Sequence, residues 1–273
     1  MNDDSKFSVR SDVKKMAKTI LEVVEVAELN GVVCWLNYGA LLGMIRENRL
    51  LPWNNDAELS CLYTPCLPKK FKLIVDHLNK IGYSAYFYSS IGALAVKTHN
   101  TVVNVNCIWI ENKSAVRPHE TASEKGYAPL ISRIFYWIGT FFVAYPSGFV
   151  RYKGEKFSGK LILKSTLITL FRILPIFLRK KLFLLMIIIS QYLGGDYKKT
   201  VMPSKYFKEF EKIKFYDGQV YVPKSPQNLL RYIYGEDWQT PKENWSFYDK
   251  KNKKQTNMIF KDEKWNYSDT DFL

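Results

Sequence analysis

The sequence predicts an α/β (α+β) fold in which helices flank a mixed β-sheet, and three observations lead to this prediction. The chain has 273 residues, which is long enough to bury a large core. Hydrophobic residues make up 47% of it and aromatic residues 15%, whereas disordered chains have few aromatics. Strand patterns alternate with amphipathic helix patterns along its first part, an order typical of a sheet with helices packed on it.

The first 124 residues carry this alternation. Apolar residues recur at helical spacing after Ser11 or Asp12, the expected N-cap, and Gly31 follows the predicted helix. Turn signals separate three later β-rich segments, which we expect to form an antiparallel meander. The predicted helices are Ser11–Asn30, Ala40–Arg46 and Lys69–Lys80, and the predicted strands are Val32–Leu36, Asp56–Leu62, Tyr83–Tyr88, Ala93–Thr98 and Thr101–Ile110.

The composition changes after about residue 125. From Lys125 to Gly195 there are eleven basic residues and one acidic residue, Glu155. Charges interrupt the apolar runs at 134–144, 161–178 and 182–189, so none reaches the roughly 18 to 20 uncharged residues of a spanning helix. Basic residues among short apolar runs are typical of helices that lie in the plane of an anionic membrane. The alternative is a helical subdomain whose apolar faces are buried as core.

The last part of the chain returns to a polar composition. Residues Phe215–Val222, broken by Asp217-Gly218, predict a hairpin, and Ser225–Tyr234 predicts a capped helix. The final ten residues are expected to be loose.

Charge and cysteine usage narrow the classes of function. The formal net charge of +14 predicts an anionic partner such as a phosphorylated substrate, an acidic lipid surface or nucleic acid. The four cysteines have no C-x-x-C spacing and there are three histidines, so a zinc site is disfavoured. No apolar stretch follows the charged N-terminus, which argues against a signal peptide or an anchor. We therefore expect reduced thiols in a cytoplasmic protein.

Two features of residues 39–59 suggest chemistry. Asp56 and Glu58 are two apart on a predicted strand, so their carboxylates share a face and could hold a divalent cation. The small residues from Gly39 to Gly43 follow a strand and would let backbone N–H groups approach a phosphate at a helix start. Together they suggest metal-assisted phosphoryl or nucleotidyl transfer. The alternative is that both acids lie on the solvated face of an edge strand.

Three ordered blocks of sequence resemble the LicD/fukutin family. Tyr38-Gly-Ala-Leu-Leu-Gly43 to Arg46, followed by Leu50-Leu-Pro-Trp-Asn-Asn-Asp-Ala-Glu58, is similar to the signature G-T-L-L-G-x-x-R and I-P-W-D-D-D-x-D. Val105–Ile110 resembles the later V-D-I-F strand. Val222-Pro223, Leu229-Leu230, Tyr234–Trp238 and Pro241 resemble the C-terminal P…L…Y-G-x-x-W…P signature.

The resemblance implies a polymerase-β-like nucleotidyltransferase fold and transfer of a phospho-alcohol, such as phosphocholine or ribitol phosphate, from a CDP-linked donor to a glycan. It implies that Asp56 and Glu58 are catalytic and hold Mg²⁺ or Mn²⁺ together with Asn106. Gly39 and Ala40 would form the phosphate-approach turn. Arg46 would be a phosphate or structural partner, and Trp53 either stacks on substrate or packs at the strand start.

The predicted organisation follows from the blocks and the change in composition. Residues 1–124 are a nucleotidyltransferase-like core, and 125–198 are a basic apolar helical insert at a membrane surface. Residues 199–273 complete the core and end in a loose tail. The protein would act in the cytoplasm, peripherally on the inner face of the membrane, with a CDP-alcohol donor, a glycan acceptor and no nucleic acid.

Departures from the family pattern keep other functions open. Asn54 and Asn55 replace the first two acids of the D-D-D run, Glu58 replaces its final Asp, and Asn106 stands where a third acid is expected. An amide oxygen can ligate Mg²⁺ but brings no charge. The alternatives are a catalytically degenerate binding protein of the same fold and a nucleic-acid nucleotidyltransferase. Tyr234 and Trp238 are interpreted as core or capping residues, and His99 and His119 as residues of turns.

Overall fold

The structure is a computed structural model. It describes residues 12–54, 56–88, 92–97, 101–118, 129–145, 166, 169–171, 173–195, 198–242 and 256–262. Contacts divide the chain into two compact units: Met1–Tyr63, Asn100–Val116 and Val201–Ile259 form the first, and Thr64–His99, Arg117–Thr200 and Phe260–Leu273 form the second. The three-part division made from the sequence stays a prediction.

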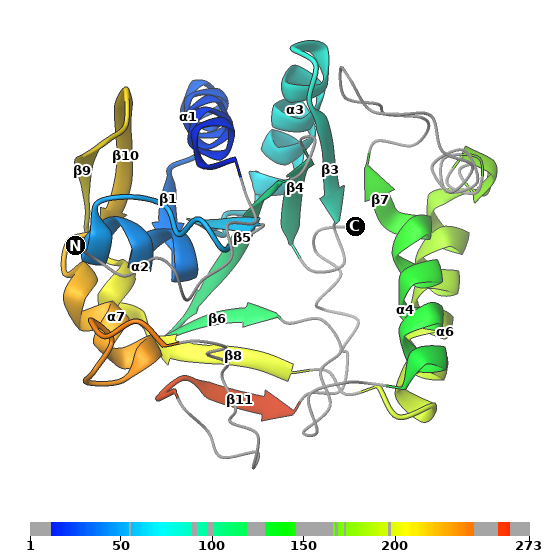
Figure 1. The fold of residues 1–273 in the computed structure, drawn as a ribbon. Coiled ribbons are helices and arrows are strands. Elements are labelled where there is room, and N and C mark those ends of the chain that lie inside the picture. Colours follow the sequence, from blue (N-terminus) through cyan, green and yellow to red (C-terminus); the bar gives the residue numbers. More distant parts are fainter. Residues whose placement is uncertain are drawn as a thin grey trace. The chain divides into compact units, whose positions relative to one another are not determined.

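The first unit is built on a mixed sheet, as the sequence predicts (Figure 1). β2 lies between β1, which is antiparallel to it, and β5, which is parallel to it. β1 pairs in parallel with β10, which forms a hairpin with β9, and β6 returns antiparallel along β5. These strands are β1 (Cys34–Asn37), β2 (Asp56–Leu62), β5 (Val102–Glu111), β6 (Ser114–Pro118), β9 (Phe210–Phe215) and β10 (Gly218–Pro223); β8 (Lys198–Pro203) and β11 (Ile259–Asp262) follow β6 in strand order.

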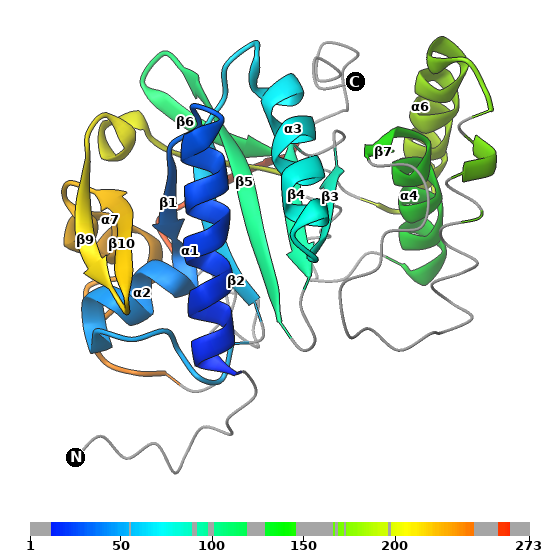
Figure 2. The ribbon, with the colours of Figure 1, turned by 90° about the horizontal axis from the view of Figure 1, so that it is seen from above.

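Helices cover both faces of this sheet (Figures 1 and 2). α1 (Val13–Leu29) lies on one face, and α2 (Tyr38–Glu47) and α7 (Pro226–Tyr234) lie on the other. Asp12 caps α1 by accepting a hydrogen bond from the Lys15 N–H at 3.1 Å. The short 3₁₀ helix η2 (Ser204–Phe207) connects β8 to β9. Buried apolar side chains fill the space between the helices and the sheet.

In the second unit, α3 (Leu67–Lys80) packs against β3 (Ser84–Tyr88). β3 is antiparallel to both β4 (Ala93–Lys97) and the short β7 (Ala144–Tyr145). The antiparallel pairing expected of the first two meander strands is therefore confirmed. β5, the third of them, runs parallel to β2.

Two apolar helices of the second unit pack side by side: α4 (Leu130–Val143) and α6 (Ile176–Tyr192). Their shared core includes the buried side chains of Tyr136, Phe183 and Ile187. Reciprocal hydrogen bonds of 2.9 Å join each of the Ser132 and Ser190 hydroxyls to the other residue's carbonyl oxygen. Among the described helices, none combines the length and apolar content needed to cross a bilayer.

Several element boundaries differ from the predictions for local reasons. Val32 is outside the first strand because its N–H donates to the Ala27 carbonyl oxygen and closes the end of α1. The second helix begins earlier, at Tyr38, because Asn37 serves as its N-cap. The predicted hairpin is longer at its first strand and turns at Tyr216, whose φ is +48°. Strands β6, β7, β8 and β11 are additional to the predicted ones.

The basic triplet Arg179-Lys180-Lys181, which interrupts the apolar runs of the sequence, lies inside α6. Lys and Arg are good helix formers, and the helix begins only after Pro175. The guanidinium of Arg179 reaches the last turn of α4, where Nη1 donates to the Phe142 carbonyl oxygen at 3.4 Å. Residues 146–165, which include the first part of the run at 161–178, are outside the described residues.

Three thiols form a row across the centre of the first unit's sheet. Cys34 on β1 pairs with Cys61 on β2, and Cys61 pairs with Cys107 on β5. All three are buried and free. The thiol–thiol hydrogen bond to Cys61 and burial raise the pKa of Cys34 well above its ordinary value. Burial is the larger cause of the similar rise at Cys61. These are core thiols, as expected of a reduced protein.

Candidate functional site

The candidate site begins at the junction of β1 and α2, which a single buried asparagine organises. The Asn37 side chain is fully buried; its Oδ1 accepts from the Tyr38 N–H at 2.9 Å and its Nδ2 donates to the Ser60 hydroxyl at 2.9 Å. This ties the start of α2 to the middle of β2. Tyr38 has a φ of +45°, a conformation that costs energy for a residue with a Cβ. The structure therefore holds a strained residue at the edge of the site.

Strand β2 presents Asp56, Glu58 and Ser60 on one face, because successive side chains of a strand alternate. Asp56 is exposed, Glu58 is half-buried and Ser60 is buried, so burial of this face increases along the strand. The opposite face, with Ala57 and Leu59, is core. This burial pattern matches neither a fully solvated strand face nor a fully buried one.

Strand register decides which residues lie beside Glu58. On one side it pairs with Asn37, and on the other with Asn104 of β5. Asn106, the predicted third ligand, pairs with Ser60, two residues further along the same face. Sequence reasoning missed Asn104, although its alternation with Val103 and Val105 was a usable signal. The metal-ligand roles of Asp56, Glu58 and Asn106 stay predictions.

Tyr234 brings the C-terminal motif to this site. Burial raises the pKa of the Tyr234 phenol well above its ordinary value, and the negative charge of Glu58 is the next cause. Tyr38 raises this pKa further, whereas Arg46 opposes the shift. The Tyr234 phenol therefore keeps its proton at neutral pH, and the charges that shift its pKa belong to residues of the candidate site.

Arg46 has a defined structural partner. Its Nε donates to Glu47 Oε1 at 3.0 Å, and Arg49 Nη2 lies 3.1 Å from Glu47 Oε2. The side chains of Arg46 and Glu47 are 9% and 6% exposed, so removing either partner would leave a buried charge uncompensated. Of the two predicted roles, the contacts describe the structural one, and a phosphate contact stays a prediction.

The loop after α2 folds back over the two glycines of the motif. A Cβ on Gly39 would lie 2.6 Å from Asn54 Nδ2, and a Cβ on Gly43 would lie 2.5 Å from the Arg49 carbonyl oxygen. Leu50 is buried and its N–H donates to the Tyr216 hydroxyl at 3.1 Å. Both glycines therefore make room for the loop that leads into β2.

The remaining predicted substrate-binding residues surround this loop. Gly39 and Ala40 lie in the first turn of α2, where backbone N–H groups have no partner within the helix. The Ala40 side chain is buried, and Trp53 is half-buried. Asn55, His99 and His119 lie outside the described residues. Phosphate approach by Gly39 and Ala40 and the alternatives for Trp53 stay predictions.

The oxygen atoms of the candidate site are of the type that a hard divalent cation prefers, but few of them are charged. Two carboxylates and the amide oxygens of Asn104 and Asn106 are oxygen ligands of the kind that Mg²⁺ and Mn²⁺ prefer. Within the described residues, no three His, Cys, Asp or Glu side chains are placed to hold a metal ion together. Asp56 and Glu58 would be its charged ligands.

A known family model covers part of the sequence that forms this site. Residues 31–79 match the family model of the LicD/FKTN/FKRP nucleotidyltransferase domain. This segment belongs to the LicD family. It spans β1, α2, β2 and α3, and so contains the Asn37–Tyr38 junction, both glycines, Asp56 and Glu58. The recognition of the family from its motifs is confirmed, and the match supports a phosphotransferase or nucleotidyltransferase type of function.

Among solved structures, two of the antibiotic-resistance factor ANT(2″)-Ia are similar to this LicD-like chain, one of them in complex with adenylyl-2″-tobramycin. The solution structure has 12% identity and a TM-score of 0.31, covering 66% of this chain and 93% of the other. The complex has 11% identity and a TM-score of 0.29, covering 65% and 99%. No significant match was found among curated proteins.

Proposed function

We propose that this protein is a metal-dependent phosphotransferase that moves a phospho-alcohol, such as phosphocholine, from a CDP-linked donor to a glycan or a lipid-linked glycan. The observation that carries the proposal is the position of Asp56 and Glu58 on one face of β2, within the LicD segment and beside the start of α2. A bound Mg²⁺ or Mn²⁺ would neutralise the phosphates of the donor and polarise the bond that breaks.

Different residues around that position would bind the cation and the donor phosphates. Asp56 and Glu58 would hold the cation, with the amides of Asn104 and Asn106 completing the polar face. The first-turn N–H groups of α2 would approach the donor phosphates. Tyr234, whose phenol stays protonated at neutral pH, would donate a hydrogen bond without adding negative charge.

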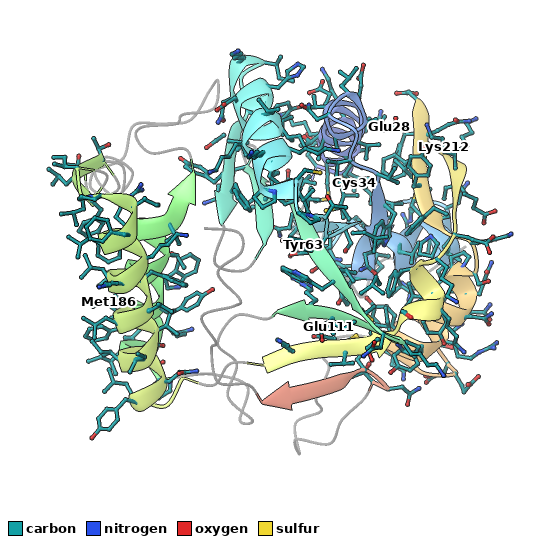
Figure 3. The ribbon with its side chains drawn as sticks, turned by 180° about the vertical axis from the view of Figure 1, so that it is seen from behind. Glu28, Cys34, Tyr63, Glu111, Met186 and Lys212 are labelled. Atoms are coloured by element: carbon teal, nitrogen blue, oxygen red, sulfur yellow. The ribbon has the colours of Figure 1, made fainter. Side chains whose placement is uncertain are left out.

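The proposal is tested by incubating the protein with Mg²⁺ or Mn²⁺ and a panel of CDP-alcohols, with and without glycan acceptors, and measuring CMP release. We expect Glu58→Gln to lower the rate by about 10²-fold or more, because it removes one of two charges that hold the cation. Glu111→Gln is the matched control: Glu111 is an exposed acid at the other end of β5 (Figure 3) and should keep full activity.

A second candidate function is a catalytically degenerate binding protein of the same fold. Asn54 and Asn106 favour it, because charge around the metal is the main source of catalysis in such transfers. Titration calorimetry separates the two: binding of a CDP-alcohol without CMP release under any metal supports this candidate, and turnover rules it out. Restoring charge by Asn106→Asp should tighten Mn²⁺ binding if Asn106 is a ligand.

We further propose that the protein works peripherally on the inner face of the cytoplasmic membrane, with α4 and α6 against anionic lipid. After the two helices pack together, Ile131, Ile134 and Trp137 of α4 stay exposed, as do Leu185 and Ile188 of α6. Lys180 and Lys181 lie on the same helix pair. Exposed apolar residues with flanking lysines are what an interfacial helix presents to headgroups. This arrangement does not favour binding of nucleic acid. Proteins bind nucleic acid through basic polar grooves with stacking aromatic residues.

Vesicle sedimentation tests the membrane proposal. The protein should bind phosphatidylglycerol-containing vesicles at low salt and release as salt rises. Replacing Lys180 and Lys181 with Gln should weaken binding by about tenfold or more, since each basic residue near the surface contributes about 1 kcal/mol. Arg179 is kept because it contacts α4. The control pair Lys14→Gln and Lys18→Gln on α1 should bind as wild type; equal losses in both pairs would refute a specific role for α6.

A further inference from the structure

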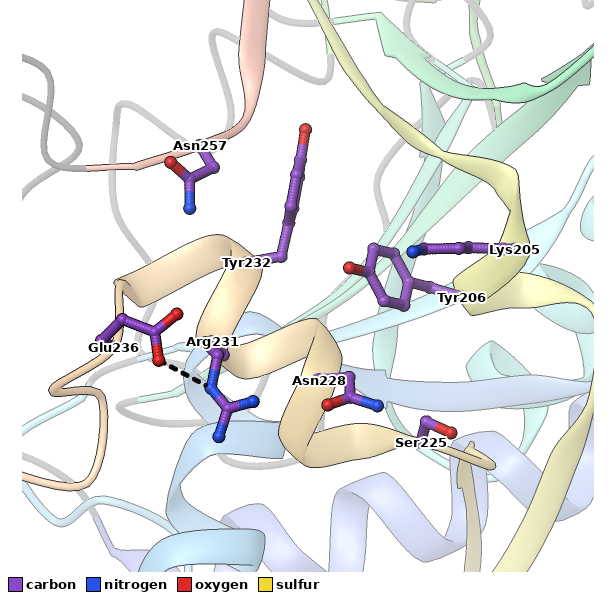
Figure 4. A pocket seen from close by; sticks show the side chains of 8 residues that line it. All are labelled: Lys205, Tyr206, Ser225, Asn228, Arg231, Tyr232, Glu236 and Asn257. Atoms are coloured by element: carbon purple, nitrogen blue, oxygen red, sulfur yellow. Dashed lines mark ion pairs between the residues drawn. The ribbon is translucent and has the colours of Figure 1, made fainter.

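A second polar site lies on α7, and Tyr234 is not one of the residues that line it. It is a pocket of about 510 Å³ between α7, η2 and the segment that contains Asn257 (Figure 4). Asn228 and Arg231, three residues apart, form one stripe of α7, and Tyr232 stands beside them. Lys205 and Tyr206 of η2 form the facing wall. None of these residues is used by the chemistry proposed above.

The aromatic part of the pocket is a pair of tyrosines. The ring centroids of Tyr206 and Tyr232 are 5.6 Å apart, with an angle of 45° between the ring planes. This separation lies within the range of about 4.5–7 Å for rings in direct contact, so no planar base fits between them. Lys205 Nζ lies 5.2 Å from the Tyr206 centroid. The pair therefore offers an apolar surface with hydroxyl tips, which suits the C–H face of a sugar ring better than a stacked nucleobase.

Arg231 forms an ion pair with a residue of the C-terminal motif. Glu236 Oε2 lies 3.0 Å from Arg231 Nε, and both side chains are exposed, so this pair leaves the terminal nitrogens of the guanidinium available to a ligand. The terminal nitrogens point away from Glu236, on the side of Asn228 (Figure 4). Glu236 reaches Arg231 because Gly235 has a φ of +93° and turns the chain back at the end of α7. Two cationic side chains and one acidic side chain line the pocket. This charge favours an anion that can accept hydrogen bonds from two N–H groups of the Arg231 guanidinium.

The remaining walls carry groups that both donate and accept hydrogen bonds. Ser225 and Asn228 of α7 contribute a hydroxyl and an amide, and Asn257 contributes a second amide. The Asn257 segment is anchored: its N–H donates to the Tyr232 carbonyl oxygen at 3.2 Å, and the neighbouring Met258 is buried. Hydroxyl and amide groups beside an aromatic surface match the alternating hydroxyls and C–H faces of a carbohydrate.

We propose that this pocket binds an anionic sugar unit, phosphorylated or carboxylated, of the acceptor glycan. The proposal rests on the proposed function for the identity of the glycan as acceptor, but the binding chemistry is independent of turnover. The anion would sit on the Arg231 fork with Lys205 nearby, and the sugar ring would pack on the tyrosine pair. α7 then contributes Tyr234 to the candidate catalytic face and Arg231 and Tyr232 to glycan binding.

Ligand-observed NMR and titration calorimetry on the full chain test this, with glucose 6-phosphate, glucuronate, glucose and inorganic phosphate as probes. We expect both anionic sugars to bind at least tenfold more tightly than glucose or phosphate alone. Arg231→Gln should remove that tenfold preference over glucose, whereas the exposed control Lys214→Gln should keep it. If Arg231→Gln loses the native circular dichroism spectrum, Lys205→Gln serves as a second pocket variant. It should also lower the affinity for the anionic sugars.

Two further results would overturn the proposal. Phosphate that binds as tightly as glucose 6-phosphate would show an anion site without sugar recognition. If Arg231→Gln and Lys205→Gln bind the anionic sugars with the same affinity as the wild type, the sugars bind elsewhere. Glu58→Gln separates this from the proposed function: it should lose CMP release yet bind glucose 6-phosphate as wild type. Loss of binding in that variant would place the probe at Glu58 and refute the pocket.

Discussion

Replacing Gly43 with alanine tests whether the second glycine of the motif is required by packing. A Cβ at Gly43 would lie 2.5 Å from the Arg49 carbonyl oxygen and 3.1 Å from Leu51 Cγ, and real Cβ contacts under 3.0 Å essentially do not occur. The loop would have to retreat by at least 3.0 − 2.5 = 0.5 Å. That loop is held by buried Leu50 and Leu51, so it yields at a cost.

The magnitude follows from two opposing effects. Overpacking costs about 1–3 kcal/mol. Alanine regains about 1 kcal/mol of helix propensity over glycine in the helix interior. The net change in the free energy of unfolding of Gly43→Ala is therefore a loss of about 1 kcal/mol, or about 2–4 °C in Tm. Differential scanning calorimetry measures it directly.

Gly39→Ala is the matched control on the same helix. Its Cβ would meet only the far end of the Asn54 side chain, at 2.6 Å from Nδ2, and a flexible side chain can rotate away. We expect its Tm to stay within about 2 °C of wild type. A Gly43→Ala protein that is more stable than wild type, or no less stable than Gly39→Ala, would refute the packing argument.

Three other predictions concern titratable groups. The hydrogen bond with Thr64 lowers the pKa of exposed Cys66, so a disulfide reagent at neutral pH should label one thiol per chain quickly, and Cys66→Ala should abolish that phase. The pKa of Tyr234 is raised, so its phenol stays protonated near pH 10, and Tyr234→Phe should leave the 295 nm absorbance there unchanged. The hydrogen bond between Glu28 and Lys212 lowers the pKa of Glu28 and raises the pKa of Lys212 (Figure 3). The stability that this pair contributes is therefore lost as pH falls through the Glu28 pKa or rises through the Lys212 pKa. Chemical denaturation of Glu28→Gln should show a loss of at most about 1 kcal/mol at pH 7, because the pair is partly exposed, and none near pH 3.

Local patterns in the sequence were sufficient for most of the first unit. The strand Asp56–Leu62 was predicted with its observed bounds, because alternation of polar and apolar residues reports directly on a half-buried strand. The helix at Pro226–Tyr234 was predicted within a residue, because Ser225, Pro226 and Gly235 mark its ends. The mixed sheet followed from the order of such elements.

Features that depend on distant pairing were not predictable in the same way. β8 and β11 have little apolar alternation of their own and become strands by pairing at the edge of the sheet. The hydrogen bonds between Ser132 and Ser190 join residues that are 58 positions apart, so helix packing decided how those apolar runs were arranged. The Arg231–Glu236 pair depends on the positive φ of Gly235, which the sequence allows but does not require.

The β2–β5 register shows why the sequence alone could not decide which asparagine of β5 lies beside Glu58. The sequence placed Asp56 and Glu58 on one face by the period of a strand, which needs no tertiary information. Choosing between Asn104 and Asn106 needs the register of two parallel strands separated by some 40 residues, and alternation makes both equally good candidates. The structure pairs Glu58 with Asn104 and Ser60 with Asn106. The Ser60 hydroxyl accepts a hydrogen bond from Asn37 Nδ2, so the row that contains Ser60 and Asn106 is joined to the start of α2, whereas the row that contains Asn104 lies at the half-buried Glu58.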